Sequence, residues 1–182
     1  MRNHTIFVFA LVWAILVVFA VHFLEFPGSV PNFRAVSGGG MLLDATPAFT
    51  PEAIYQRLTA YGEVGRRNYS FRNVTVDILL PLSVLPFLFL LMFRALALVP
   101  QRRFVRALLC SLPFAYVTFD FVENATILSL LANYPNRLDG LARTLPYTTI
   151  IKRAMSLLAL AIPLGLLGFQ FVRTRLAKKT HA

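Results

Sequence analysis

Two carboxyl groups and an amide lie close together within an otherwise apolar run of the chain. Asp120, Glu123 and Asn124 are spaced i, i+3 and i+4, so they share one face of a helix. Charged groups are expensive to hold at membrane depth and tend to serve a function there. Two desolvated carboxyl groups one turn apart also tend to differ in proton affinity, which suits general acid/base catalysis or a proton relay. The sequence therefore predicts Asp120 and Glu123 as catalytic residues.

Other polar residues could complete a binding site around this pair. Tyr116 lies one turn before Asp120 on the same helical face, and Asp77 opens another apolar run. Arginine and lysine residues from the connecting segments could hold an anionic head group. The predicted ligand-binding residues are Asn124, Tyr116, Asp77, Arg66, Arg67, Arg72, Lys152 and Arg153.

The same carboxyl groups also fit a purely structural role. Asp120 and Glu123 could form ion pairs with arginines of the 66–72 segment and hold that segment against the membrane helices. Asn124 could hydrogen-bond between helices, as amides in membrane proteins commonly do. The sequence leaves the catalytic and the structural interpretation open.

Metal and thiol chemistry have weak support in the sequence. His22 and Glu25 lie one turn apart, but one histidine with scattered acids is a poor metal-binding pattern. We therefore expect no metal and no cofactor. Cys110 is the only cysteine, which excludes an intrachain disulfide and any reaction that needs paired thiols.

The composition indicates a membrane protein. Of the 182 residues, 57% are hydrophobic and only 14% are charged, whereas a soluble domain has about half and about a quarter. The apolar residues gather in blocks of about twenty, the length of a helix that crosses a bilayer. We expect a single membrane domain over residues 1–182, with spans at about 5–26, 76–99, 104–131 and 154–172.

A long loop, residues 27–75, separates the first two spans and contains a helix-start signal. Thr50 suits the N-cap, Pro51 the first helical position and Glu52 the first turn of a helix. Apolar residues then recur at helical spacing at positions 54, 58, 61 and 64. This pattern predicts an amphipathic helix that is too short and too polar to span and that caps the membrane helices.

Two further details of the spans can be predicted. Pro81 and Pro86 lie in the first half of the second span, which predicts a kink or a locally unwound segment near Asp77. Residues 133–152 contain several charges and predict a loop with a short helix at 139–144. Lys152 and Arg153 would then stand at the start of the fourth span.

The basic residues predict an orientation. With four spans both termini lie on one side, and basic residues concentrate on that side in the tight central loop and the tail. They are Arg2, Arg102, Arg103, Arg106, Arg173, Arg175, Lys178 and Lys179. We therefore expect both termini in the cytoplasm, and the preference for Arg over Lys favours a bacterial inner membrane. At a rise of 1.5 Å per residue, Asp120 and Glu123 would lie about 3 and 8 Å from the bilayer centre, in its outer half.

The fold expected is all-α: four transmembrane helices in a bundle, plus one amphipathic helix in the first non-cytoplasmic loop. The function expected is an outer-leaflet polar site that binds or transforms a small lipophilic or lipid-like molecule by carboxylate acid/base chemistry. The alternative is a non-enzymatic accessory or scaffold subunit whose buried carboxylates form structural ion pairs. Ion-coupled transport is less favoured, because only one span carries deep ionisable residues.

The expected partners follow from these hypotheses. They are membrane lipids, a small lipophilic ligand, and a membrane-protein partner or a second copy of the chain. Nucleic acid is not expected: the net charge of +10 is carried by short loops and the tail, where orientation and anionic lipid head groups account for it.

Overall fold

The computed structural model describes residues 2–180, and it leaves out the side chains of Arg2, Asn3, Arg175 and residues 177–180. The tail charges Arg175, Lys178 and Lys179 and the N-terminal Arg2 therefore lie outside the described side chains. Over this range the chain is all-helical, which confirms the predicted class. The helices are α1 (Arg2–Phe23), α2 (Val30–Val36), α3 (Pro51–Ala60), α4 (Gly62–Val74), α5 (Val76–Ala97), α6 (Arg103–Asn133) and α7 (Asp139–Thr180).

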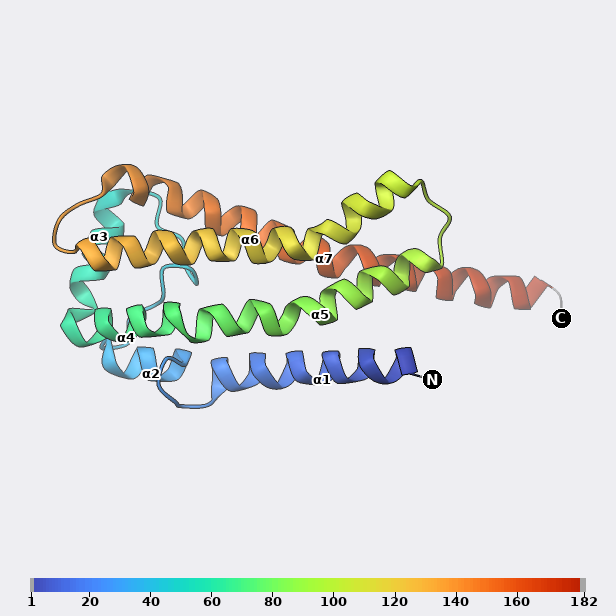
Figure 1. Ribbon diagram of the computed structural model, residues 1–182, viewed down its shortest axis with the longest axis horizontal. Helices are drawn as coiled ribbons and strands as arrows, with labels where there is room; N and C mark the ends of the chain where they lie inside the picture. Colours follow the sequence, from blue (N-terminus) through green and yellow to red (C-terminus); the bar gives the residue numbers. More distant parts are fainter. Residues whose placement is uncertain (1, 181–182) are drawn as a thin grey trace.

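Four helical stretches are long and apolar enough to cross a membrane, as the sequence predicts. They are His4–Phe23, Gly62–Ala97, Arg103–Asn133 and Asp139–Thr174. Figure 1 shows α1, α5, α6 and α7 running lengthwise, with both ends of the chain at one end of the molecule and α2, α3 and α4 at the other. Helix α5 contacts α1, α6 and α7, whereas α1 packs mainly on α5. Their length and composition are consistent with an integral membrane protein.

Helix α5 stays helical through both of its prolines, so of the two predicted outcomes, a kink or local unwinding, the unwinding does not occur. It runs from Val76 to Ala97, and the chain breaks from helical geometry only at Thr75, before it begins. Pro81 has no N–H, so the carbonyl of Asp77 four residues earlier loses its helical donor. The side-chain amide of Asn124 on α6 donates to that carbonyl instead, at 3.0 Å. A neighbouring helix thus satisfies the freed group, and no unwinding is needed.

The predicted loop over residues 133–152 is wrong. Helix α7 begins at Asp139 and continues without a break to Thr180. The charges that indicated a loop fall on its partly exposed faces, while Ala142, Leu145 and Thr149 are buried on the opposite side. Residues 139–152 are therefore helical because they pack against other parts of the tertiary structure. Lys152 lies about 20 Å along α7 rather than at its start, and this depth lets it reach α6.

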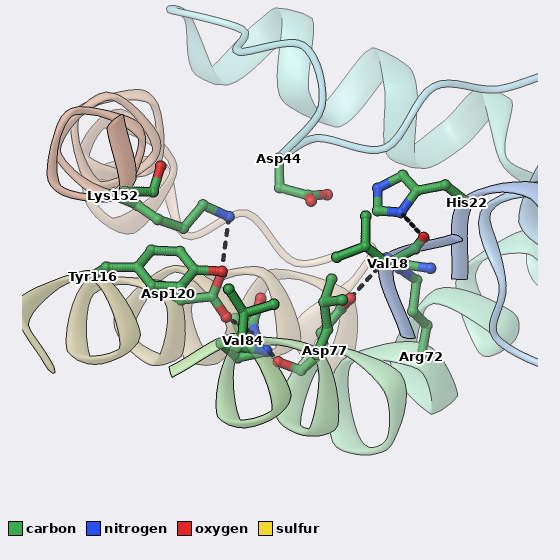
Figure 2. A pocket seen from close by; sticks show the side chains of 13 residues that line it. Val18, His22, Asp44, Arg72, Asp77, Val84, Tyr116, Asp120 and Lys152 are labelled. Carbon is green, nitrogen blue, oxygen red and sulfur yellow. Dashed lines mark hydrogen bonds and ion pairs between the residues drawn. The ribbon is translucent and has the colours of Figure 1, made fainter. Parts of the chain in front are cut away.

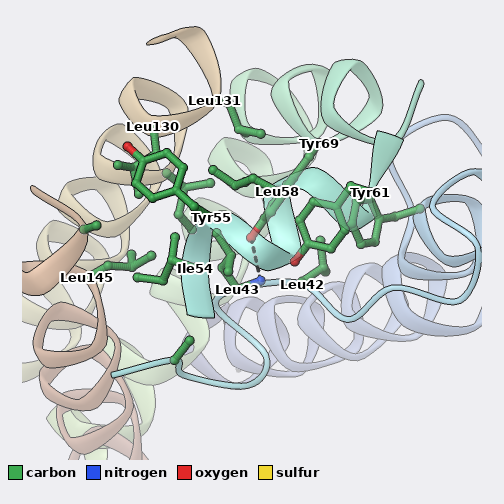
Figure 3. Close-up of a cluster of buried hydrophobic side chains, with 14 residues drawn as sticks. Leu42, Leu43, Ile54, Tyr55, Leu58, Tyr61, Tyr69, Leu130, Leu131 and Leu145 are labelled. Atoms are coloured by element: carbon green, nitrogen blue, oxygen red, sulfur yellow. Dashed lines mark hydrogen bonds between the residues drawn. The ribbon is translucent and has the colours of Figure 1, made fainter. Parts of the chain in front are cut away.

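Residues 27–75, which we call the cap, fold over one end of the long helices. Thr50 caps α3 by accepting a hydrogen bond from the backbone N–H of Ala53 at 3.3 Å. The cap has its own buried apolar core, which includes the ends of α6 and α7 (Figure 3). The core side chains are Phe33, Leu42, Leu43, Ala48, Ile54, Tyr55, Leu58, Tyr61, Tyr69, Ile127, Leu130, Leu131, Ala142 and Leu145. This core fixes the cap against the two helices that carry the predicted site.

Candidate binding site

A cavity of about 320 Å³ lies beneath the cap, between the long helices. Residues one turn apart on α1, α5, α6 and α7 form its walls, because i and i+4 side chains share a helical face. Asp44, from the cap, lies over it (Figure 2). The lining residues are Val18, His22, Asp44, Arg72, Asp77, Leu80, Pro81, Val84, Tyr116, Asp120, Asn124, Lys152 and Ser156.

Asp120 lines this cavity and is held by two neighbours. The ammonium group of Lys152 lies 3.2 Å from its Oδ1 atom, and the amide of Asn124 donates to its Oδ2 atom at 3.1 Å. Tyr116, one turn earlier on α6, lines the same wall, and its hydroxyl forms no hydrogen bond with the described residues. Asp120 and Tyr116 thus present a carboxylate and a phenol to the same space.

Glu123 has a different environment from Asp120, although it is only one turn away. Its side chain is 0% exposed and does not line the cavity. It forms an ion pair with Lys152 and accepts a hydrogen bond from the hydroxyl of Thr149. Both partners come from α7, so Glu123 ties α6 to α7. The sequence analysis did not single out Thr149, and its position within a predicted loop explains why.

Arg72 and Asp77 form a second buried ion pair at the cavity wall. The Arg72 Nη2 and Asp77 Oδ1 atoms are 2.8 Å apart, and Arg72 also donates to the carbonyl of Gly28 at 2.7 Å. Arg72 is 2% exposed, and its Nε atom has no hydrogen-bond partner among the described residues. This pair joins the end of α4, the start of α5 and the loop after α1.

Asp44 is a residue of the cavity that the sequence analysis missed. The fully buried Tyr69 donates its hydroxyl to Asp44 Oδ1 at 2.9 Å and accepts from the backbone N–H of Leu43 at 3.0 Å. The Tyr69 ring packs against Phe33 and Tyr61, with centroids 5.1 and 6.0 Å away. Nothing in the sequence marks a lone acid in a long loop as part of a site.

The predicted cationic residues divide into two groups. Arg72 and Lys152 line the cavity, and the adjacent Arg153 donates to the backbone carbonyls of Asp44 and Ala45 at 2.6 and 2.7 Å, which fixes the cap loop to α7. Arg66 and Arg67 do not line it. Arg66 instead donates to the carbonyl of Leu58 at 2.9 Å and stacks over the ring of Tyr134 at 4.1 Å. Arg67 is exposed on the cap surface.

His22 reaches the cavity but does not complete a metal site. Its Nδ1 atom hydrogen-bonds to the carbonyl of Val18, one turn earlier in α1, at 2.8 Å. Among the described residues, no group of three or more His, Cys, Asp and Glu side chains has the arrangement to hold a metal ion. Glu25 is exposed and is not part of the cavity wall.

In the cap, Tyr61 is kept as a neutral hydrogen-bond donor. Burial raises its pKa above the ordinary tyrosine value. Its hydroxyl donates to the carbonyl of Met41 at 2.5 Å, in the loop that carries Asp44. Tyr61 and Tyr69 thus both hydrogen-bond to the backbone of that loop, at Met41 and Leu43.

Fold and site together describe an all-helical protein with four helices able to cross a membrane and a charged cavity beneath a cap. No known protein family matches the chain, and comparisons with curated proteins and with solved structures found no match.

Proposed function

We propose that the protein binds a small lipid-like molecule whose polar head enters the cavity, and that Asp120 exchanges a proton with that head. The observation that carries this proposal is the position of Asp120. Its carboxylate lines a cavity of about 320 Å³, held by Lys152 and Asn124. Ligand-binding cavities in proteins have volumes of roughly 300–1,000 Å³, so this space suits a small head group.

The walls of the cavity support an amphiphilic ligand. Val18, Leu80 and Val84 provide apolar surface, and Tyr116, Asp120 and Lys152 provide polar groups beside them. The helices that contribute these residues also expose many large apolar side chains on their outer surfaces, as helices in contact with lipid would. A molecule whose chain stays in the lipid can therefore place its head among the charges.

The carboxyl groups have separate roles in this proposal. Asp120 acts as the acid or base, in a reaction such as an isomerisation or a hydrolysis, and the unengaged hydroxyl of Tyr116 helps to orient the ligand. Glu123 does not touch the ligand. It positions Lys152, which in turn orients Asp120.

The same proposal includes the arrangement in the membrane. The four long helices form a bundle with the cap, including α3 as an amphipathic helix, at the outer surface of a bacterial inner membrane. Both termini face the cytoplasm. Support comes from Arg102, in the connection between α5 and α6, and Arg103, the first residue of α6, because this connection lies at the same end as the termini (Figure 1).

The test compares two conservative substitutions in the full-length protein purified in mild detergent. We expect Asp120→Asn to remove a lipid-like molecule that co-purifies with the wild-type protein, as measured by native mass spectrometry, while the melting temperature changes little. Glu123→Gln should mainly lower the melting temperature. Glu25→Gln, an exposed acid outside the cavity, serves as the matched control. Retention of the same molecule by Asp120→Asn at wild-type occupancy would contradict the proposal.

One observation favours the alternative of a non-enzymatic accessory or scaffold subunit. Glu123, Lys152 and Thr149 form a closed polar contact between α6 and α7 that serves structure without any ligand. Under this alternative Asp120 is a further member of the same ion-pair network. Co-purification with another membrane protein at fixed stoichiometry, without any bound lipid-like molecule, would support it.

A further inference from the structure

The charges around the cavity do not balance. Among the described residues, three carboxylates line the cavity (Asp44, Asp77 and Asp120), and Glu123 lies just behind its wall. The ion pairs of these four acids involve two cations, Arg72 and Lys152, and His22 is the other basic residue of the described lining. Arg72 pairs with Asp77, while Lys152 is shared by Asp120 and Glu123. Unbalanced charge in a partly desolvated space is costly, and a bound counter-charge reduces that cost.

Asp44 is the carboxylate without a cation. Within the described part of the chain it forms no ion pair, and its recorded side-chain contact is the hydroxyl of Tyr69. The guanidinium of Arg153 is nearby but donates to the backbone carbonyls of Asp44 and Ala45. Figure 2 shows the Asp44 carboxylate directed into the cavity, between Lys152 and His22. Its backbone and Oδ1 atom are fixed before any ligand arrives.

We propose that the ligand's head group is an organic cation, an ammonium group bound between Asp44 and Asp120. The inference rests on the proposed function and specifies its ligand. It differs from the anionic head group expected from the sequence, because Arg66 and Arg67 do not line the cavity. An anion would also have to compete with carboxylates that already occupy Arg72 and Lys152.

Two further groups fit such a head. The ring of Tyr116 lines the cavity beside Asp120, and cations are attracted to aromatic faces. The buried Nε–H of Arg72, which has no acceptor among the described residues, can donate to a ligand oxygen. The cavity therefore matches an ammonium group that carries a neighbouring hydroxyl or ether oxygen.

An apolar groove next to the cavity suits the alkyl chain of this amine. This groove of about 270 Å³ lies between α1 and α5, and its lining includes Trp13, Val17, Val21, Leu79 and Leu80. Leu80 lines both the groove and the cavity, so the two spaces share a wall. The proposal places a single alkyl chain in this groove and its head past Leu80, in the cavity that Asp120 lines.

The test uses dodecylamine, dodecan-1-ol and laurate as probes on the full-length protein in a nonionic detergent, each at the same mole fraction. These molecules share a chain length and differ in head charge. Because a ligand stabilises the state that it binds, we expect dodecylamine to raise the melting temperature most. Asp44→Asn should weaken the apparent affinity for dodecylamine about tenfold or more, since a charge-assisted contact is lost. Asp139→Asn, at a half-exposed acid that pairs with Arg137 outside the cavity, should leave it unchanged.

Other outcomes separate this inference from the proposed function. Stronger stabilisation by laurate or dodecan-1-ol that disappears in Asp120→Asn would overturn the cationic head and leave the proposed function standing. Equal binding of dodecylamine to the wild type and to Asp44→Asn would likewise overturn it. Failure of all three probes to stabilise the wild-type protein would count against both. If Asp44→Asn does not fold, the comparison of the three probes on the wild-type protein still decides.

Discussion

The two carboxylates that pair with Lys152, Asp120 and Glu123, differ in their access to the cavity. On one side, Glu123 is fully buried against Lys152 and Thr149, and the polar contact is closed. On the other, Asp120 shares the same ammonium group but lines the cavity. The two carboxylates are one helical turn apart and looked equivalent in the sequence. Their comparison indicates that access to a ligand separates a positioning carboxylate from a reactive one.

A second contrast, between the cap core and the cavity, explains how the open side keeps its shape. The cap core is apolar and closed, and its tyrosines direct their hydroxyls to the loop that carries Asp44. The cavity next to it is an open space with several charged side chains in its wall. Rigid packing on one side is what allows an unpaired carboxylate to remain in place on the other.

Removal of Lys152, the cation that Asp120 and Glu123 share, should remove the difference between the two carboxylates and have the largest effect on stability. Lys152→Met leaves Asp120 and Glu123 close together without a counter-charge, and the loss of one partner of a buried ion pair costs about 3–5 kcal/mol. We expect a strongly lowered melting temperature in detergent. Lys152→Met combined with Glu123→Gln should recover a large part of the loss, because the sealed side then holds no charge. An unchanged melting temperature in the single variant would contradict the structural role of Lys152.

Asn124 lines the cavity next to Asp120, and its hydrogen bond to the carbonyl of Asp77 is needed because Pro81 lacks an N–H. Asn124→Ala leaves the carbonyl of Asp77 without a donor, which should lower the free energy of unfolding by about 1 kcal/mol. Pro81→Ala restores a backbone N–H four residues after Asp77, so Asn124→Ala should cost less in that background. A double-mutant cycle followed by chemical or thermal denaturation measures the difference. Asn124→Ala also removes the hydrogen bond from Asn124 to Asp120, but this loss is the same with and without Pro81→Ala and so cancels in the cycle. Additive effects would show that Asn124 does not substitute for the missing helical donor.

The Glu52–Arg137 ion pair is exposed to solvent, unlike the two buried carboxylates, and its loss should have the smallest effect on stability. The pKa of Glu52 is lowered by backbone hydrogen bonding at the start of α3 and then by the side chain of Arg137. The pKa is lower in the folded state, so the contribution of Glu52 to stability is present above its ordinary pKa, about 4.3, and is lost as the pH falls below it. The difference in melting temperature between wild type and Glu52→Gln should therefore be small at about pH 6 and vanish at about pH 3. An equal difference at both pH values would contradict this assignment.

The local features of the fold were predictable because they depend on short stretches of sequence. Apolar runs of sufficient length indicated the four membrane-length helices. Thr50 and Pro51 indicated the start of α3, because caps are set by neighbouring residues. The start of α7 was not predictable in this way. Its polar first turns are helical because Ala142 and Leu145 pack into the cap core, a contact with residues far away in the sequence.

The sequence by itself determined that Asp120, Glu123 and Asn124 share one face of one helix, since helical spacing is a local property. Only the tertiary structure decided what each of them faces. It brought Lys152 to both carboxylates, closed Thr149 over Glu123, and set Asp44 over the open side. These contacts join residues that are 26 to 109 positions apart. Such pairings depend on how whole helices pack, and no local pattern of residue types specifies them.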